Sequence, residues 1–65
     1  MDTHTVKKTV REIASLAHDP DAAHGREDKL FAAVLKAIAE GAPNASELAA
    51  AALKSKEIRF SRWTG

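Results

Sequence analysis

Apolar residues recur at helical spacing near the start of the chain. Successive members of this stripe are four or three residues apart: Val6, Val10, Ile13 and Leu16. This spacing places them on one side of an α-helix and leaves the charged residues between them on the other side. Thr3 or Thr5 is expected to cap the start, and Pro20 disfavours helical geometry just before it. The pattern therefore predicts an amphipathic helix over residues 5–17.

The middle of the chain carries the strongest helical signal. A broad apolar face that is expected to be buried lies there: Leu30, Phe31, Val34, Leu35 and Ile38. Gly41 follows and is a typical helix-ending residue, so we expect a helix over residues 26–40. The earlier Asp19-Pro20 pair is also a favourable helix start. However, Gly25 costs about 1 kcal/mol inside a helix, and residues 20–25 are expected to form only a turn.

A third helix is predicted over residues 45–55. Asn44 followed by Glu47 has the layout of a capping box, with Asn in place of Ser or Thr. The apolar side of this helix comprises Leu48, Ala52 and Leu53. The alanine run 49–52 offers a smooth surface that another helix can approach closely.

The C-terminal segment is the most distinctive part of the sequence. Its large apolar residues are spaced too irregularly for a clean helix or strand: Ile58, Phe60 and Trp63. We interpret the segment as a tail folded onto the bundle. The expected fold is all-α, a compact three-helix bundle with a C-terminal aromatic tail packed on it, forming one domain over residues 1–65.

Composition indicates a thin core that neither a disulfide bond nor a thiolate metal site can stabilise. Fourteen of the 65 residues are alanine, and there is no cysteine. A chain of this length buries only about 60% of its unfolded surface, so its stability margin is small. Both a homodimer and a monomer that binds another protein remain open. No apolar run is long enough to span a bilayer and no secretory signal is apparent, which predicts a cytoplasmic protein without membrane contact.

Charge is balanced overall but separated along the chain. The net charge is +1, residues 19–28 carry a local balance of minus three, and residues 54–65 carry plus three. We expect the two blocks to pair internally, with Arg59 and Arg62 facing Glu27 and Asp28. A nucleic-acid surface that uses the basic C-terminal segment is the alternative.

The polar cluster in residues 18–28 is the main candidate for chemistry. Histidine and carboxylate side chains there could bind a metal: His18, Asp21, His24 and Asp28. The simpler interpretation is that Asp19 caps a helix, Glu27 and Asp28 favour a helix N-terminus through the dipole, and the histidines are exposed. We therefore expect no metal and no other cofactor.

The chain also lacks a supported nucleophile and a phosphate loop, so it is not expected to be an enzyme.

Basic and aromatic residues alternate at the C-terminus, as they often do in protein-interface hot spots. The candidate partner-binding residues are Phe60, Arg62, Trp63 and Arg59. An equally simple interpretation is that the aromatic side chains close an underfilled core.

A scattered motif resembles one found in short uncharacterised proteins of bacteria and their bacteriophages. It comprises Ala23-His24, Glu27-Asp28, and Glu57-Ile58 leading to Phe60-Ser61-Arg62-Trp63. The resemblance implies a small helical protein with no established activity to transfer. Our leading hypothesis is a small cytoplasmic protein-interaction module that binds a partner or itself through the Trp63 tail and an adjacent helical face.

Overall fold

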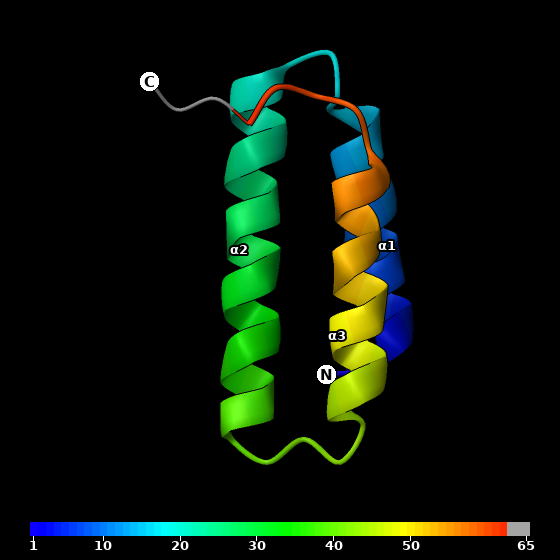
Figure 1. Ribbon diagram of the computed structural model, residues 1–65, viewed down its shortest axis with the longest axis vertical. Coiled ribbons are helices and arrows are strands. Elements are labelled where there is room, and N and C mark those ends of the chain that lie inside the picture. Colours follow the sequence, from blue (N-terminus) through cyan, green and yellow to red (C-terminus); the bar gives the residue numbers. More distant parts are fainter. Residues whose placement is uncertain (63–65) are drawn as a thin grey trace.

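Three helices pack against one another in the computed structural model, which describes residues 1–62 (Figure 1). Helix α1 spans Thr3–Ser15, α2 spans Pro20–Ala39 and α3 spans Ala45–Leu53. A short 3₁₀ turn, η1, follows over Lys54–Glu57. Helices α1 and α3 run in the same direction and α2 runs opposite to both (Figure 1). The predicted all-α three-helix bundle is therefore confirmed.

The core is small and rich in alanine. Its buried hydrophobic side chains come from all three helices: Val6, Ile13, Ala23, Leu30, Val34, Leu48, Ala51 and Ala52. Half-buried side chains surround this centre, among them Val10, Leu16, Phe31 and Ile38. The buried members of α1 and α2 repeat at helical spacing, which is why the sequence pattern identified the inner faces of these helices.

Helix α1 begins two residues earlier than predicted and ends two residues earlier. The Asp2 carboxylate caps it by accepting a hydrogen bond from the Thr5 backbone N–H at 2.8 Å, so neither Thr3 nor Thr5 is the cap. At the other end, the Leu16 N–H binds the Ile13 carbonyl oxygen at 2.9 Å, which tightens the last turn. The Asp2 cap therefore accounts for the earlier start of the helix, and the tight turn at Leu16 accounts for its earlier end.

Helix α2 starts at Pro20, which corrects the prediction that residues 20–25 form a turn. Asp19 caps it by accepting a hydrogen bond from the Ala22 N–H at 3.3 Å. Gly25 lies inside the helix, where its cost of about 1 kcal/mol is offset by burial on either side. Ala23 and Glu27 are the two buried residues that flank it.

The end of α2 agrees with the sequence. Gly41 adopts a φ of 92°, a left-handed conformation that favours glycine. Its N–H donates to the Ile38 carbonyl oxygen, and the Ala42 N–H donates to the Ala37 carbonyl oxygen, both at 3.0 Å. This pair of bonds is a Schellman motif, which satisfies the last carbonyl groups of the helix.

Helix α3 is shorter than predicted, because the chain tightens into η1 after Leu53. Asn44 precedes the helix, but its side chain makes no capping hydrogen bond, so the predicted capping box is absent. The Asn44 amide instead donates to the Met1 carbonyl oxygen at 3.4 Å. The tighter turn of η1 places Ser55 inside the molecule, where it is fully buried.

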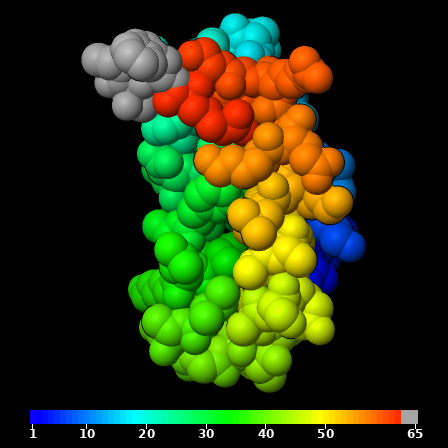
Figure 2. Space-filling view, in the orientation of Figure 1, coloured from blue at the N-terminus to red at the C-terminus, as the bar shows by residue number. Residues whose placement is uncertain are grey.

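The C-terminal segment, residues 58–62, crosses from the end of η1 to the N-terminal half of α2 (Figures 1 and 2). Ile58 and Phe60 are half-buried and pack against the core. The predicted packing of the tail is confirmed for these residues. Trp63, the third large apolar residue of the segment, lies outside the described residues.

Candidate functional site

An apolar groove lies between α2 and α3, and we call it the α2–α3 groove. It has a volume of about 260 Å³, and apolar side chains line it: Phe31, Val34, Leu35, Ile38, Ala49, Ala52 and Leu53. Both leucines of this set project into solvent, with Leu35 66% exposed and Leu53 61% exposed. Because alanine side chains are short, α3 leaves this channel open beside the larger side chains of α2.

The exposure of Leu35 corrects the prediction that its whole apolar face is buried, and Leu53 is exposed although it lies on the predicted apolar side of α3. Leu30 and Val34 define the inward direction of α2, since both are buried. Leu35 follows Val34 by one residue, which rotates its side chain about 100° away from that direction. The sequence showed a broad apolar stripe, and its width was the available signal that part of it would be exposed.

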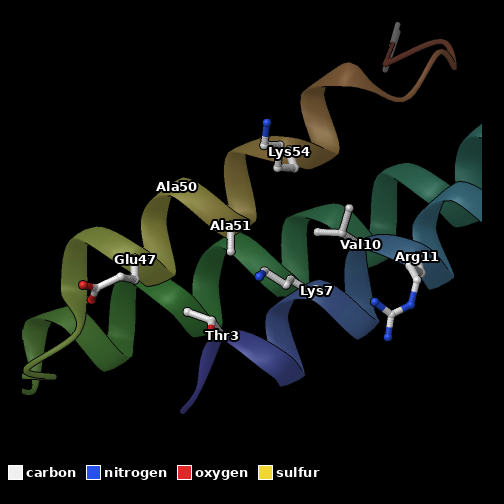
Figure 3. A pocket seen from close by; sticks show the side chains of 8 residues that line it. All are labelled: Thr3, Lys7, Val10, Arg11, Glu47, Ala50, Ala51 and Lys54. Carbon is white, nitrogen blue, oxygen red and sulfur yellow. The ribbon is translucent and has the colours of Figure 1, made fainter.

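A second groove lies between α1 and α3, and we call it the α1–α3 groove (Figure 3). Its volume is about 610 Å³, and its lining residues are Thr3, Lys7, Val10 and Arg11 from α1, Glu47, Ala50 and Ala51 from α3, and Lys54 at the start of η1. Its floor is apolar and its rim is charged. In the sequence, the charged residues of α1 indicated only a solvent-exposed face.

A buried carboxylate joins the C-terminal segment to α2. Glu27 is only 2% exposed, yet it is charged and lies in the middle of the helix. The Arg62 guanidinium grips both of its oxygens, with Nε donating to Oε1 at 2.9 Å and Nη2 donating to Oε2 at 3.0 Å. The Ser55 hydroxyl donates to Oε2 at 2.8 Å, and the Lys56 Nζ lies 3.6 Å from Oε1. We call these four residues the Glu27 cluster.

Arg62 also fixes the path of its own segment. Its Nη2 donates to the carbonyl oxygens of Ser55 at 2.9 Å and Ile58 at 3.2 Å. Its guanidinium carbon lies 4.0 Å from the ring centroid of Phe60, a cation–π distance. One side chain therefore ties together α2, η1 and the C-terminal segment.

Electrostatics keep the Glu27 carboxylate ionised in spite of its burial. Burial by itself raises the pKa of Glu27, because it disfavours the charged form. Hydrogen bonds from Arg62 and Ser55, with the positive charges of Arg62 and Lys56, outweigh that effect and lower the pKa below its ordinary value. Hydrogen bonding to Glu27 raises the pKa of Arg62. The cluster is thus an ion pair whose charged form is favoured.

The predicted pairing of the two charge blocks is correct for one of its members. Arg62 meets Glu27, whereas Arg59 is exposed and has no ion pair within residues 1–62. Asp28 lies 3.5 Å from the His24 Nδ1 instead of facing an arginine. Glu27 does not act at a helix N-terminus as expected, because α2 starts two turns earlier and turns this residue inward. Ser55, which completes the cluster, had no recognisable signal in the sequence.

The basic residues near the C-terminus are largely engaged within the protein. Lys54 lies 3.3 Å from Glu57, in an exposed contact. Lys56 approaches Glu27 and also lies 5.3 Å from the ring centroid of Phe31. Arg62 also pairs with Glu27. Among the described residues, Arg59 is therefore the member of this basic set that has no ion pair. Lys56 and Arg62 thus contact the buried Glu27 carboxylate, whereas Lys54 and Arg59 remain exposed.

The candidate metal ligands do not form a cluster. Of the four residues His18, Asp21, His24 and Asp28, the structure brings only His24 and Asp28 into contact. Within residues 1–62, no three histidine or acidic side chains come together as a metal site would require. In the same part of the chain, no helix combines the length and apolar character needed to cross a bilayer.

The candidate partner-binding set is divided by the structure. Phe60 and Arg62 are half-buried and contact the bundle, while Arg59 is exposed. Trp63 lies outside the described residues. The contacts of Phe60 and Arg62 therefore favour the interpretation in which the tail closes the core.

Comparisons with known proteins add no relative on which an assignment could rest. No protein-family model matches the chain, and searches of curated proteins and of solved structures gave no significant match.

Proposed function

We propose that this chain is a small protein-interaction module that binds through the α2–α3 groove. The observation that carries the proposal is the exposure of Leu35 and Leu53 on either side of a channel lined by apolar side chains. Burying one large aliphatic side chain contributes about 1.5 to 3 kcal/mol. Two such residues beside one channel would therefore supply much of the energy of a modest interface.

The small core of the bundle is a second argument for a partner that binds in the α2–α3 groove. Of the eight buried hydrophobic residues in the described part of the chain, three are alanines. A partner that inserts an apolar side chain between Leu35 and Leu53 would extend this core outward. A second copy of the chain is one such partner, because a twofold axis beside the groove would place the same two leucines on both sides.

The C-terminal segment supports this surface from the other end of α2. Arg62 binds both Glu27 and the Ser55 carbonyl oxygen, and it therefore holds α2 beside η1, which continues directly from α3. We keep Arg59 and Trp63 within the proposal as residues that could extend the contact. A cytoplasmic setting and a relationship to short proteins of bacteria and bacteriophages, suggested by the Glu57-Ile58 and Phe60 to Trp63 motif, are also proposed.

Oligomeric state and partner capture test this function together. Leu35→Gln and Leu53→Gln would be compared with Ala32→Gln, an exposed α2 position that does not line the groove. We expect the unaltered chain to form a dimer in sedimentation analysis, or to capture a partner from a host extract. Both leucine variants should lose that association and the Ala32 variant should keep it.

The opposite results would refute the proposal. If the chain is monomeric at all concentrations and captures no partner, it is not an interaction module. Capture that survives both leucine substitutions would move the binding surface elsewhere. A Trp63→Ala variant measured in parallel separates the groove from the tail, because loss of capture in that variant alone would place the binding surface at the tail.

A further inference from the structure

The α1–α3 groove has the dimensions of a docking surface for a helix. The lining residues lie up to eight positions apart on α1, from Thr3 to Arg11, and seven apart from Glu47 on α3 to Lys54 at the start of η1. The groove is therefore about two helical turns long, about 11 Å. Val10, Ala50 and Ala51 form the apolar floor. Small side chains on the floor allow the backbone of another helix to approach closely.

The rim of the groove is positively charged over most of its length. Figure 3 shows Thr3 and Glu47 toward one end, Lys54 and Arg11 toward the other, and Lys7 between them. Lys7 and Arg11 are exposed, and neither has an ion pair within the described residues. Lys54 contacts Glu57, but both side chains are 70% exposed, and such pairs contribute little. Lys54 can therefore exchange this contact for a carboxylate of a partner.

We propose that the α1–α3 groove docks an acidic amphipathic helix of a partner protein. The small apolar side chains of that helix would lie against Val10, Ala50 and Ala51. Its carboxylates would lie near Lys7, Arg11 and Lys54, and its cationic or neutral end would lie near Glu47. Charge complementarity fixes the orientation as well as the class of the partner.

The chemistry of the groove favours an acidic helix over a nucleic acid. Phosphate backbones need cations along the whole contact, whereas Glu47 stands at one end and the floor offers apolar side chains. The chain as a whole carries a net charge of only +1. An apolar floor with a cationic rim instead matches the two faces of an acidic amphipathic helix.

This surface is separate from the α2–α3 groove. Ala50 and Ala51 line the α1–α3 groove from one side of α3, and Ala49, Ala52 and Leu53 line the α2–α3 groove from the other. The short side chains of the alanine run therefore leave a groove on each flank of the same helix. The inference does not rest on the proposed function, and a Leu53→Gln variant should keep its affinity for an acidic helix.

Fluorescence anisotropy with a synthetic peptide tests the inference. The probe is a labelled helical peptide of about four turns with alanine along one face and glutamate on its flanks. We expect binding that weakens as salt rises. Lys7→Glu and Arg11→Glu should each weaken it by about tenfold. Lys8→Glu is the matched control, since Lys8 is an exposed cation on α1 outside the groove.

Each alternative outcome is decisive. Equal loss in the Lys7 and Lys8 variants would show general charge attraction and overturn the inference. So would undiminished binding of a peptide with glutamine in place of glutamate, or no binding at low salt. Binding of a DNA oligonucleotide but not of the peptide would assign the groove to nucleic acid. Recovery of binding between the Lys7→Glu variant and a lysine-bearing peptide would confirm the docking site even if that variant is less stable.

Discussion

The Arg62 guanidinium holds both oxygens of the Glu27 carboxylate across 35 positions of sequence, at 2.9 and 3.0 Å. The carboxylate is buried, while the arginine side chain is 26% exposed. A buried ion pair adds little over an apolar pair of the same shape, but removing one partner leaves the other charge uncompensated. The fold therefore requires Glu27 and Arg62 to be present together. Their main effect is to fix the position of the C-terminal segment.

Arg62→Met should destabilise the protein strongly. Breaking a buried ion pair costs about 3 to 5 kcal/mol. A 65-residue domain has a free energy of unfolding of only about 3 to 10 kcal/mol, so this variant should lose about a third or more of its stability. Arg59→Met is the control, because Arg59 is exposed, and should change the free energy of unfolding by less than about 0.5 kcal/mol. Urea denaturation followed by circular dichroism compares them; similar losses in both would contradict the importance of the pair.

Replacing both partners should cost less than the two single replacements together. In Glu27→Leu with Arg62→Met, neither charge is left buried without its partner. We expect a coupling free energy of about 1 to 3 kcal/mol in favour of the pair, from a double-mutant cycle of urea denaturation. Additive losses would show that Lys56 and Ser55 alone satisfy the carboxylate.

Stability should fall in acid because of Glu27. Its pKa is below the ordinary value of 4.5 in the folded protein, so the unfolded chain binds a proton more readily. The contribution of this group is therefore fully present above that ordinary value and is lost as the pH falls through the folded pKa. Thermal denaturation at a series of pH values measures this loss.

Two variants identify the source of the acid response. Glu27→Gln should flatten the pH dependence of the melting temperature below about pH 5. Asp2 contributes in the same direction, since hydrogen bonds from Thr5 lower its pKa at the start of α1. Asp2→Asn should therefore remove a smaller, separate part. An unchanged pH profile in Glu27→Gln would place the acid response elsewhere.

The sequence predicted the fold better than the site, for physical reasons. Periodicity identified the inner faces of α1 and α2 because burial follows the helical repeat, as Ile13 and Leu30 show. The start of α2 was predicted wrongly because the cost of Gly25 was weighed without the burial of Glu27. That burial depends on Arg62, which lies far away in the sequence.

The two grooves could not be predicted from the pattern of apolar residues in the sequence. The alanine run 49–52 indicated close helix approach, but a groove requires knowing which flanks of α3 remain uncovered. Leu35 and Leu53 looked like core residues because hydrophobicity does not reveal whether a neighbour exists to cover them. Their exposure depends on how the three helices are arranged around one another.

Replacing Gly25 and Gly41 by alanine should change the stability of the protein in opposite directions. At Gly25, a Cβ would meet nothing within 4 Å and the residue lies inside α2, so Gly25→Ala should stabilise by about 0.5 to 1 kcal/mol. At Gly41, the φ of 92° strains any other residue, so Gly41→Ala should destabilise by about 1 kcal/mol or more. Urea denaturation of the two variants measures both signs. A stabilising Gly41→Ala would contradict the left-handed end of α2.

Two leucines five residues apart on α2 should separate folding from binding. Leu30 is 5% exposed, and Leu30→Ala should cost about 2 to 5 kcal/mol through lost burial and a cavity. Leu35 is 66% exposed, and Leu35→Ala should cost less than about 0.5 kcal/mol in the monomer. Urea denaturation at high dilution makes the comparison. A large loss at Leu35 that disappears on dilution would reveal a dimer covering the α2–α3 groove, whereas a large loss at every dilution would show that Leu35 is buried within the monomer.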